Sequence, residues 1–199
     1  MDVPPASTEE RKVVSVLFAD LVDSTALADR RDPEDVRATL RPLHQRLRVE
    51  LERHGGAVEK FIGDAVMALF GAPVAREDDA ERAVRAALAI RRTVAELDPS
   101  LQVRIGVATG EALVDLTADP RAGEGVAAGD IVNTGFRIAA AAPTGGILVD
   151  ETTYYATRDG IAYLPREPAH AKGKAEPVPV WQVEGPRAPS SPRGRRREH

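Results

Sequence analysis

The sequence predicts an α+β fold built on one folded unit, and three observations carry this prediction. Apolar residues recur at helical spacing in two long segments, which indicates two amphipathic helices. Two short apolar runs between these segments flank a glycine turn, which is typical of a β-hairpin. Further apolar runs of strand length stand before the first helix and after the second. The order strand, helix, strand, strand, helix, strand is that of a ferredoxin-like βαββαβ core, to which C-terminal elements are added.

Length and charge favour a single domain without a nucleic-acid partner. The chain has 199 residues, of which 43% are hydrophobic, and a net charge of −4. This charge gives no general attraction to nucleic acid or to an anionic membrane. We expect a folded unit at 12–184 between disordered segments at 1–11 and 185–199, because both ends are polar, contain proline and lack apolar periodicity.

The chain contains no cysteine, no signal-peptide pattern and no apolar run long enough to cross a bilayer. Disulfides and thiolate metal sites are therefore excluded, and we expect a cytoplasmic protein without membrane insertion. The histidines show no metal-ligand spacing, so surface or capping positions are expected for His44, His54 and His170.

The first strand and the first helix follow from two apolar patterns. Val13 to Ala19 form a continuous run that predicts a buried strand. Asp32 and Pro33 have the pattern of an N-cap followed by proline in the first helical turn. Because Pro42 removes a backbone hydrogen bond, it predicts a kink or a late start of this helix, and Gly55 marks its end. The expected apolar face consists of Val36, Leu40, Leu43, Leu47 and Leu51.

A hairpin and a second helix are expected next. Strands at 57–60 and 65–70 flank Ile62-Gly63-Asp64, which places Asp64 at or beside the tip of the turn. Three acidic residues then open an alanine-rich helix at 77–97, where they favour the positive end of the helix dipole.

The C-terminal half is expected to add a strand at 101–109 and a helix that ends at Pro143. Between them, 110–129 is poor in periodicity and predicts an irregular excursion. The remaining expected elements are a strand at 147–149, a short helix at 151–158 and a closing strand at 178–183.

Two carboxylates lie at the edges of expected strands and carry the functional prediction. Asp20 follows a buried run in FADLVDST, and Asp64 lies in the hairpin turn of KFIGDAVMALFG. Two such carboxylates can hold a pair of Mg²⁺ or Mn²⁺ ions, and the hydroxyls and backbone N–H groups after Asp20 could receive phosphate oxygens. An isolated aspartate at a strand end is more often a cap or turn residue, so the pairing of the two is what points to nucleotide chemistry.

Five sequence blocks resemble those of class III nucleotidyl cyclase catalytic domains. They are FADLVDST, KFIGDAVMALFG, RIGVATGE, GDIVNTGFRIA with GGILV, and KGKAEPVPVW, in the family's order and approximate spacing. The resemblance covers about 12–184 and is greatest to the bacterial adenylate/guanylate cyclase homology domains at the front of larger signalling proteins. One block alone is weak, whereas five in register are specific.

The resemblance implies a role for each matching residue. It implies metal binding by the carboxylates of Asp20 and Asp64 and by the backbone carbonyl of Leu21. It implies that Asn133 orients the ribose and that Arg137 stabilises charge in the transition state. The implied substrate contacts are Thr25 and Arg104 to the triphosphate, Lys60 to the purine edge and Lys172 to the terminal phosphates.

The implied reaction is intramolecular. The ribose 3′ oxygen of ATP attacks the α-phosphorus and pyrophosphate leaves, which gives 3′,5′-cyclic AMP with two Mg²⁺ or Mn²⁺ ions per site. In the family one chain supplies the metal aspartates and Arg104, and the other supplies Lys60, Asn133, Arg137 and Lys172. Because this chain carries both sets, the resemblance implies a homodimer with two shared sites.

Two positions depart from the family pattern. Val126 stands seven positions before Asn133, where adenine-specific members usually carry an acid, and Asp23 stands where many members have glycine. Use of GTP therefore remains an alternative to ATP. A second alternative is a weakly active or inactive nucleotide-sensing dimerisation domain that regulates an attached module. A ferredoxin-like nucleic-acid binder is disfavoured because only 4% of the residues are aromatic.

Overall fold

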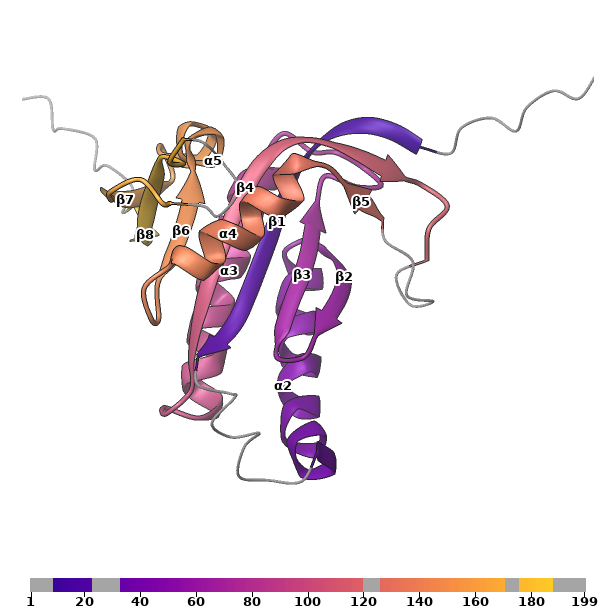
Figure 1. Cartoon of the computed structure of the whole chain (residues 1–199), viewed down its shortest axis with the longest axis vertical. Coiled ribbons are helices and arrows are strands. Elements are labelled where there is room, and N and C mark those ends of the chain that lie inside the picture. The colour runs from indigo at the N-terminus through magenta and orange to yellow at the C-terminus, as the bar shows by residue number, and fades with distance from the viewer. Residues whose placement is uncertain (1–8, 23–32, 120–125, 171–175, 188–199) are drawn as a thin grey trace, which may run out of the picture.

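The computed structural model describes residues 9–22, 33–119, 126–170 and 176–187. One mixed sheet runs in the order β2-β3-β1-β4-β6-β8-β7, and β5 pairs with β4 (Figure 1). The elements are β1 (Glu9–Val22), α2 (Pro33–Arg53), β2 (Ala57–Ile62), β3 (Ala65–Phe70), α3 (Asp79–Leu97), β4 (Gln102–Asp115), β5 (Ala127–Ala128), α4 (Asp130–Ala141), β6 (Ile147–Asp150), α5 (Glu151–Thr157), β7 (Ile161–Pro165) and β8 (Val180–Pro186).

The predicted ferredoxin-like core is confirmed. β1 pairs antiparallel with both β3 and β4, and β2 pairs antiparallel with β3. This gives the order β2-β3-β1-β4, with α2 and α3 as the two connecting helices. The C-terminal additions extend the same sheet, because β6 pairs parallel with β4 and antiparallel with β8.

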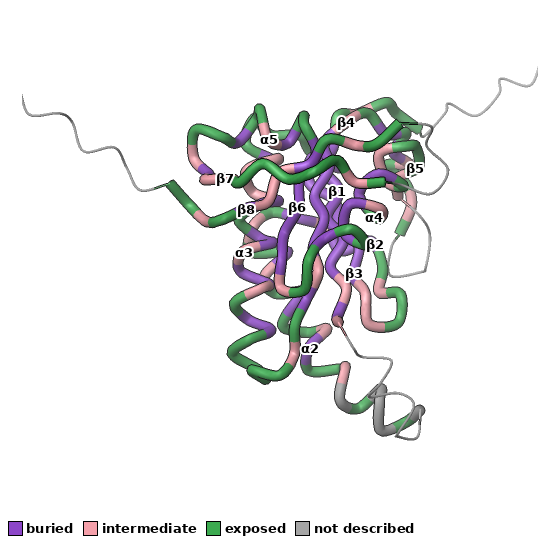
Figure 2. The backbone as a smooth tube through the Cα atoms, turned by 60° about the vertical axis from the view of Figure 1, so that its left-hand side comes forward, coloured by how far each residue is buried: buried purple, intermediate pink, exposed green. Residues whose placement is uncertain are grey.

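The central part of strand β1 is buried (Figure 2). Its alternating side chains belong to two separate cores, one on each face of the sheet. Leu17, Ala19 and Leu21 pack with the buried residues of α2 and α3. Val16 and Phe18 pack on the opposite face with the buried residues of α4. Asp20 follows Val16 and Phe18 in the alternation along β1, so its side chain lies on the same face of the sheet as theirs, the face that α4 covers.

α4 approaches the sheet closely because two glycines meet at the contact. A Cβ on Gly106 of β4 would lie 2.3 Å from the backbone nitrogen of Ala139 and 2.7 Å from the carbonyl oxygen of Gly135. A Cβ on Gly135 would lie 2.6 Å from Cγ2 of Val16. Any side chain at either position would therefore force α4 away from β4 and β1.

Several predicted boundaries are wrong because β1 and β4 pair over a greater length than their apolar runs. Their register extends from Glu9 opposite Asp115 to Val22 opposite Gln102. Glu9 to Arg11 therefore belong to β1 although a disordered segment was expected there. Likewise 110–115 belong to β4 although an irregular excursion was expected there. Of the rest of that excursion, 116–119 are irregular as expected, Ala127–Ala128 form the short strand β5, and 120–125 lie outside the described ranges.

Other differences concern proline and the C-terminal edge. α2 includes Pro42 without a late start. Ala38 and Pro42 are both exposed, so water can hydrate the Ala38 carbonyl that lacks its usual N–H partner. Strand β7 has no counterpart among the elements expected from the sequence, and β8 ends at Pro186, two residues beyond the expected end of the folded unit. No helix in the described ranges has the length and apolar character needed to cross a membrane.

A buried polar cluster joins β1, β4 and α5. Asp150 caps α5 by accepting hydrogen bonds from the backbone N–H and the hydroxyl of Thr153, at 3.1 and 2.5 Å, and it also accepts one from the backbone N–H of Thr109 at 3.2 Å. The hydroxyl of Thr109 lies 2.8 Å from those of both Ser15 and Thr153. Burial raises the pKa of Asp150, and the hydrogen bonds from Thr153 and Thr109 offset part of that rise.

Asp150→Asn is expected to destabilise the domain by about 1–2 kcal/mol near pH 4 and by less near pH 8. A carboxyl whose pKa is raised by folding stabilises the native state below its unfolded pKa, and this contribution is lost as the pH rises through its folded pKa. The wild type loses that contribution with rising pH, whereas the asparagine variant has none to lose. Urea unfolding at both pH values measures the difference.

The matched control is Asp98→Asn, because hydrogen bonds from Ser100 lower the pKa of Asp98. Its destabilising effect should therefore grow from pH 4 to pH 8, opposite to that of Asp150→Asn. Equal losses at both pH values for Asp150→Asn would show that its carboxylate is not held in the buried cluster.

Candidate active site

One end of the sheet brings together three of the residues selected from the sequence. In the strand register Asp20 of β1 lies opposite Ala65 of β3 on one side and opposite Arg104 of β4 on the other. Asp64 directly precedes Ala65 in the hairpin turn. The end of β1, the β2–β3 turn and the start of β4 lie at the same end of the sheet (Figure 1). The register therefore places two carboxylates and one guanidinium close together at this edge.

The turn that carries Asp64 depends on Gly63. Its φ of +63° lies in the left-handed region, which glycine adopts without strain. The turn has only two residues between Ile62 and Ala65, so it fixes the position of Asp64 relative to the strands. The predicted hairpin with Asp64 at its tip is thus confirmed.

The neighbouring carboxylate of Asp64 affects the pKa of Asp20. Burial raises the pKa of Asp20, the negative charge of Asp64 raises it further, and the positive charge of Arg104 lowers it. A cation between the two carboxylates would neutralise their buried negative charge and remove the repulsion between them. The donor set therefore fits a hard divalent cation such as Mg²⁺ or Mn²⁺.

Further ligands for such a cation must come from elsewhere. Across the described ranges no cluster of three or more His, Cys, Asp or Glu side chains could hold a metal ion. Mg²⁺ commonly binds one or two carboxylates and completes its shell with water and substrate phosphates. Leu21 contributes its side chain to the core, so only its backbone is available to a metal.

Arg104 combines a positive charge with unused hydrogen-bonding capacity. Its Nε atom is buried and, within the described part of the chain, has no hydrogen-bond partner. A buried guanidinium donor without a partner is costly, and an anion at the site would satisfy it. Beside two carboxylates that can hold a cation, the Arg104 guanidinium is suited to contact a phosphate group.

The other predicted site residues that the structure describes lie on β2 and α4. Lys60 is on β2, where its ammonium group lies 3.9 Å from Oε1 of Glu59. Asn133 and Arg137 are one helical turn apart on α4. The neighbouring helix residues Thr134, Gly135, Ile138 and Ala139 are buried against the sheet, so Asn133 and Arg137 share the side of α4 that faces away from it.

Lys60, Asn133 and Arg137 do not belong to the strand register that brings Asp20, Asp64 and Arg104 together. Lys60 lies on β2 opposite Met67, and the other two lie on α4. Thr25 and Lys172 lie outside the described residues.

The sequence interpretation of the histidines was right for His54 and wrong for His44. The His54 Nδ1 atom lies 2.7 Å from the Glu50 carbonyl oxygen, so His54 caps the end of α2. His44 instead stacks on Phe61 of β2, with ring centroids 4.3 Å apart, and hydrogen-bonds the backbone of Gly63. Burial lowers the pKa of His44. This histidine supports the turn that carries Asp64, and no spacing pattern in the sequence indicates such a contact.

The sequence and the structure of this chain match those of known cyclases. The family described as the adenylate and guanylate cyclase catalytic domain matches residues 6–185. The chain belongs to this cyclase family. Adenylate cyclase 1 of Rhizobium meliloti is 29% identical over 185 residues, which cover 88% of this chain and 28% of that protein.

Solved cyclase structures share the fold of this cyclase domain. The adenylyl cyclase CyaB from P. aeruginosa has a TM-score of 0.81 at 27% identity and covers 88% of this chain and 95% of that one. The guanylyl cyclase Cya2 has a TM-score of 0.82 at 28% identity and covers 91% and 96%. Both adenylyl and guanylyl cyclases thus share this fold, and the domain spans about a quarter of the length of its curated relative.

Proposed function

We propose that this domain is an adenylate cyclase that converts ATP into 3′,5′-cyclic AMP and pyrophosphate in sites shared between two identical chains. The observation that carries the proposal is the edge formed by Asp20, Asp64 and Arg104, which joins a cation site to an anion contact. Membership in the cyclase family gives this edge its chemistry. The similarity to an adenylate cyclase and the presence of Lys60 favour ATP. We also propose that the domain works in the cytoplasm, where ATP and Mg²⁺ are available.

The mechanism assigns a separate task to each residue. Two Mg²⁺ or Mn²⁺ ions, held by Asp20, Asp64 and the Leu21 carbonyl, would supply charge neutralisation and activation of the 3′ hydroxyl. Arg104 binds the triphosphate through its guanidinium, whose buried Nε donor has no partner among the described residues. Asn133 orients the ribose, and Arg137 stabilises the negative charge that develops around the α-phosphorus. Lys60 contacts the purine edge, and Thr25 and Lys172 contact phosphates.

A shared site explains why the described residues fall into two groups. Asp20, Asp64 and Arg104 lie at one edge of the sheet, whereas Asn133 and Arg137 lie on the outward side of α4. We call the edge formed by Asp20, Asp64 and Arg104 the metal edge. A second copy of the chain can bring its α4 residues to the metal edge of the first. Because the arrangement is reciprocal, a symmetric dimer contains two complete sites.

The test is to incubate the purified domain with ATP or GTP and Mn²⁺ and to measure cyclic nucleotide. We expect cyclic AMP to be the main product, and we expect chelation of the metal with EDTA or the Asp20→Ala substitution to abolish it. Cyclic GMP as the main product would correct the base preference, which Val126 at the usual acidic position leaves open. Bound nucleotide in an intact dimer without any product would support the alternative of a nucleotide-sensing domain.

A further inference from the structure

Glu59 is a buried carboxylate beside Lys60 that the mechanism above does not use. Its side chain is only 2% exposed, whereas the side chain of Lys60 is 50% exposed. Burial raises the pKa of Glu59, and the positive charge of Lys60 lowers it. Burying an ionisable group lowers the stability of the folded state, so a buried glutamate is unfavourable on this short edge strand unless it has a function.

A β-bulge places Glu59 and Lys60 on the same face of the sheet. In a regular strand two consecutive side chains point to opposite faces. The β2–β3 register shifts between Val58 and Lys60, so Glu59 is the extra residue. Val58 and Phe61 consequently both pack with the core under α2 and α3. Lys60 lies opposite Met67, whose side chain belongs to the core on the α4 side.

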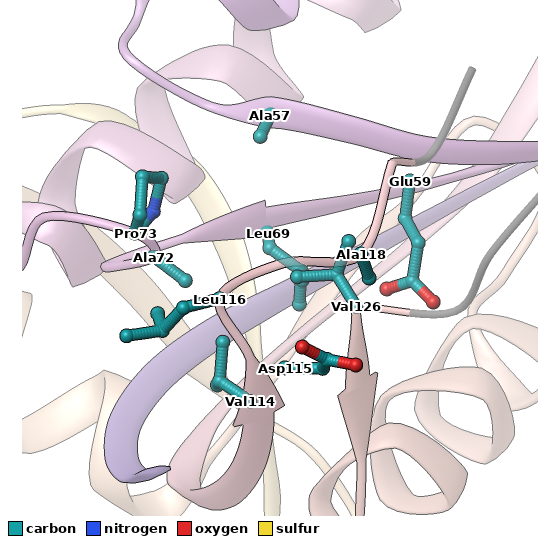
Figure 3. A pocket seen from close by; sticks show the side chains of 10 residues that line it. All are labelled: Ala57, Glu59, Leu69, Ala72, Pro73, Val114, Asp115, Leu116, Ala118 and Val126. Atoms are coloured by element: carbon teal, nitrogen blue, oxygen red, sulfur yellow. The ribbon is translucent and has the colours of Figure 1, made fainter. Parts of the chain in front are cut away.

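Glu59 also connects β2 with the segment that leads into α4. Its carboxylate accepts hydrogen bonds from the backbone N–H groups of Val126 and Ala127, at the start of β5. Figure 3 shows Glu59 reaching from its strand toward Val126. α4 begins at Asp130, directly after β5, and carries Asn133 and Arg137. One carboxylate therefore joins the strand that bears Lys60 to the segment that places Asn133 and Arg137.

The Glu59 carboxylate retains unused hydrogen-bonding capacity. Oε2 is buried and has no hydrogen-bond partner among the described residues. Glu59 lines a cavity of about 180 Å³ together with Asp115 and Val126 (Figure 3). A purely structural tether would gain stability from an uncharged side chain or from full pairing, because a half-satisfied buried carboxylate is unfavourable. Its negative charge is thus better explained by the lysine beside it.

We propose that Glu59 is a positioning residue for purine recognition: anchored by the β5 backbone, its charge holds the ammonium group of Lys60 in place toward the purine edge. The inference rests on the proposed cyclase function. It also accounts for Val126, which stands where adenine-specific members of the family usually carry an acid. In this chain the carboxylate next to Lys60 is that of Glu59. Val126 contributes its backbone N–H to the same arrangement.

Glu59→Gln keeps the size and a hydrogen-bond acceptor but removes the charge. We expect the KM for ATP to rise about tenfold and kcat to change less than about threefold, because Lys60 contacts the base and not the reacting phosphate. In a Lys60→Ala background the same substitution should change KM by less than about twofold, since Glu59 acts through Lys60. A similar KM increase in both backgrounds, or none in the wild-type background, would overturn the inference.

Glu50→Gln is the matched control, because Glu50 also has a buried Oε2 without a partner among the described residues and lies near one cation, Arg53. It lies on α2, so its substitution should leave KM for ATP unchanged. A wild type that cyclises neither ATP nor GTP would overturn the cyclase proposal and the inference with it. An active wild type whose KM does not respond to Glu59→Gln would overturn the inference alone.

A second measurement keeps the inference testable if Glu59→Gln does not fold. Lys60→Gln alters a half-exposed side chain, and NMR titration can follow the Glu59 carboxyl in this variant and in the wild type. The pKa of Glu59 should be higher in Lys60→Gln, because the neighbouring positive charge is gone. An unchanged pKa would show that the two charges do not interact and would overturn the inference.

Discussion

Asp64→Ala and Arg137→Ala are each expected to lose at least about a hundredfold in cyclase turnover, and mixing the two inactive variants is expected to restore activity. Asp64 lies beside Asp20 at the metal edge, whereas Arg137 lies on the outward side of α4. In a mixed dimer one of the two sites combines an intact metal edge with an intact α4. Random pairing of equal amounts makes half of the dimers mixed, so about a quarter of the wild-type activity should return.

The control is a mixture of Asp20→Ala with Asp64→Ala. Both substitutions damage the metal edge, so every site in such a mixed dimer contains one defective edge and no activity should return. Cyclic AMP production, measured together with the dimer fraction, distinguishes the mixtures. Failure of the first mixture to recover in an intact dimer, or recovery of the second, would contradict a site shared between chains.

The sequence allowed the core of the fold to be predicted because its elements depend on local patterns. The helical spacing of Leu43, Leu47 and Leu51 predicted a helix, and all three residues are buried in α2. The apolar runs around Gly63 and Asp64 predicted the hairpin, because a two-residue turn needs little information from the rest of the chain. Such local signals were sufficient for the βαββαβ order.

Pairing between distant strands could not be predicted in the same way. The polar ends of β1 and β4 form strands because each supplies the hydrogen-bonding partner of the other, and neither Glu9 nor Asp115 belongs to an apolar run. The bulge at Glu59 has the same origin, since it depends on the register with β3. The sequence shows adjacent Glu and Lys residues, but not that they share a face.

The pairing of Asp20 with Asp64 could be predicted from the sequence, but not how the fold brings them together. The sheet register provides this, because Asp20 lies opposite Ala65, the residue after Asp64. The outward position of Asn133 and Arg137 follows from which residues of α4 are buried. Discrimination between ATP and GTP depends on a few hydrogen bonds at the purine edge, and the shared fold of adenylyl and guanylyl cyclases does not determine them.

Gly106→Ala is expected to destabilise the domain by about 3 kcal/mol and to remove its cyclase activity. The new Cβ would lie 2.3 Å from the Ala139 nitrogen, 2.7 Å from the Gly135 oxygen and 2.8 Å from the Ala139 Cα. All three are backbone atoms, so no change of rotamer relieves the contact and α4 must move away from β4. This movement would open the core around Ile138 and displace Asn133 and Arg137 together.

Gly185→Ala is the matched control, because a Cβ on this strand glycine meets nothing within 4 Å. It should change the free energy of unfolding by less than about 0.5 kcal/mol and leave activity intact. Urea unfolding of both variants, with cyclic nucleotide assays on the folded fractions, measures the two effects. Wild-type stability in Gly106→Ala would contradict the close contact between α4 and β4. A destabilised but fully active Gly106→Ala would instead contradict the role of α4 in catalysis, since the contact that positions Asn133 and Arg137 would then be dispensable.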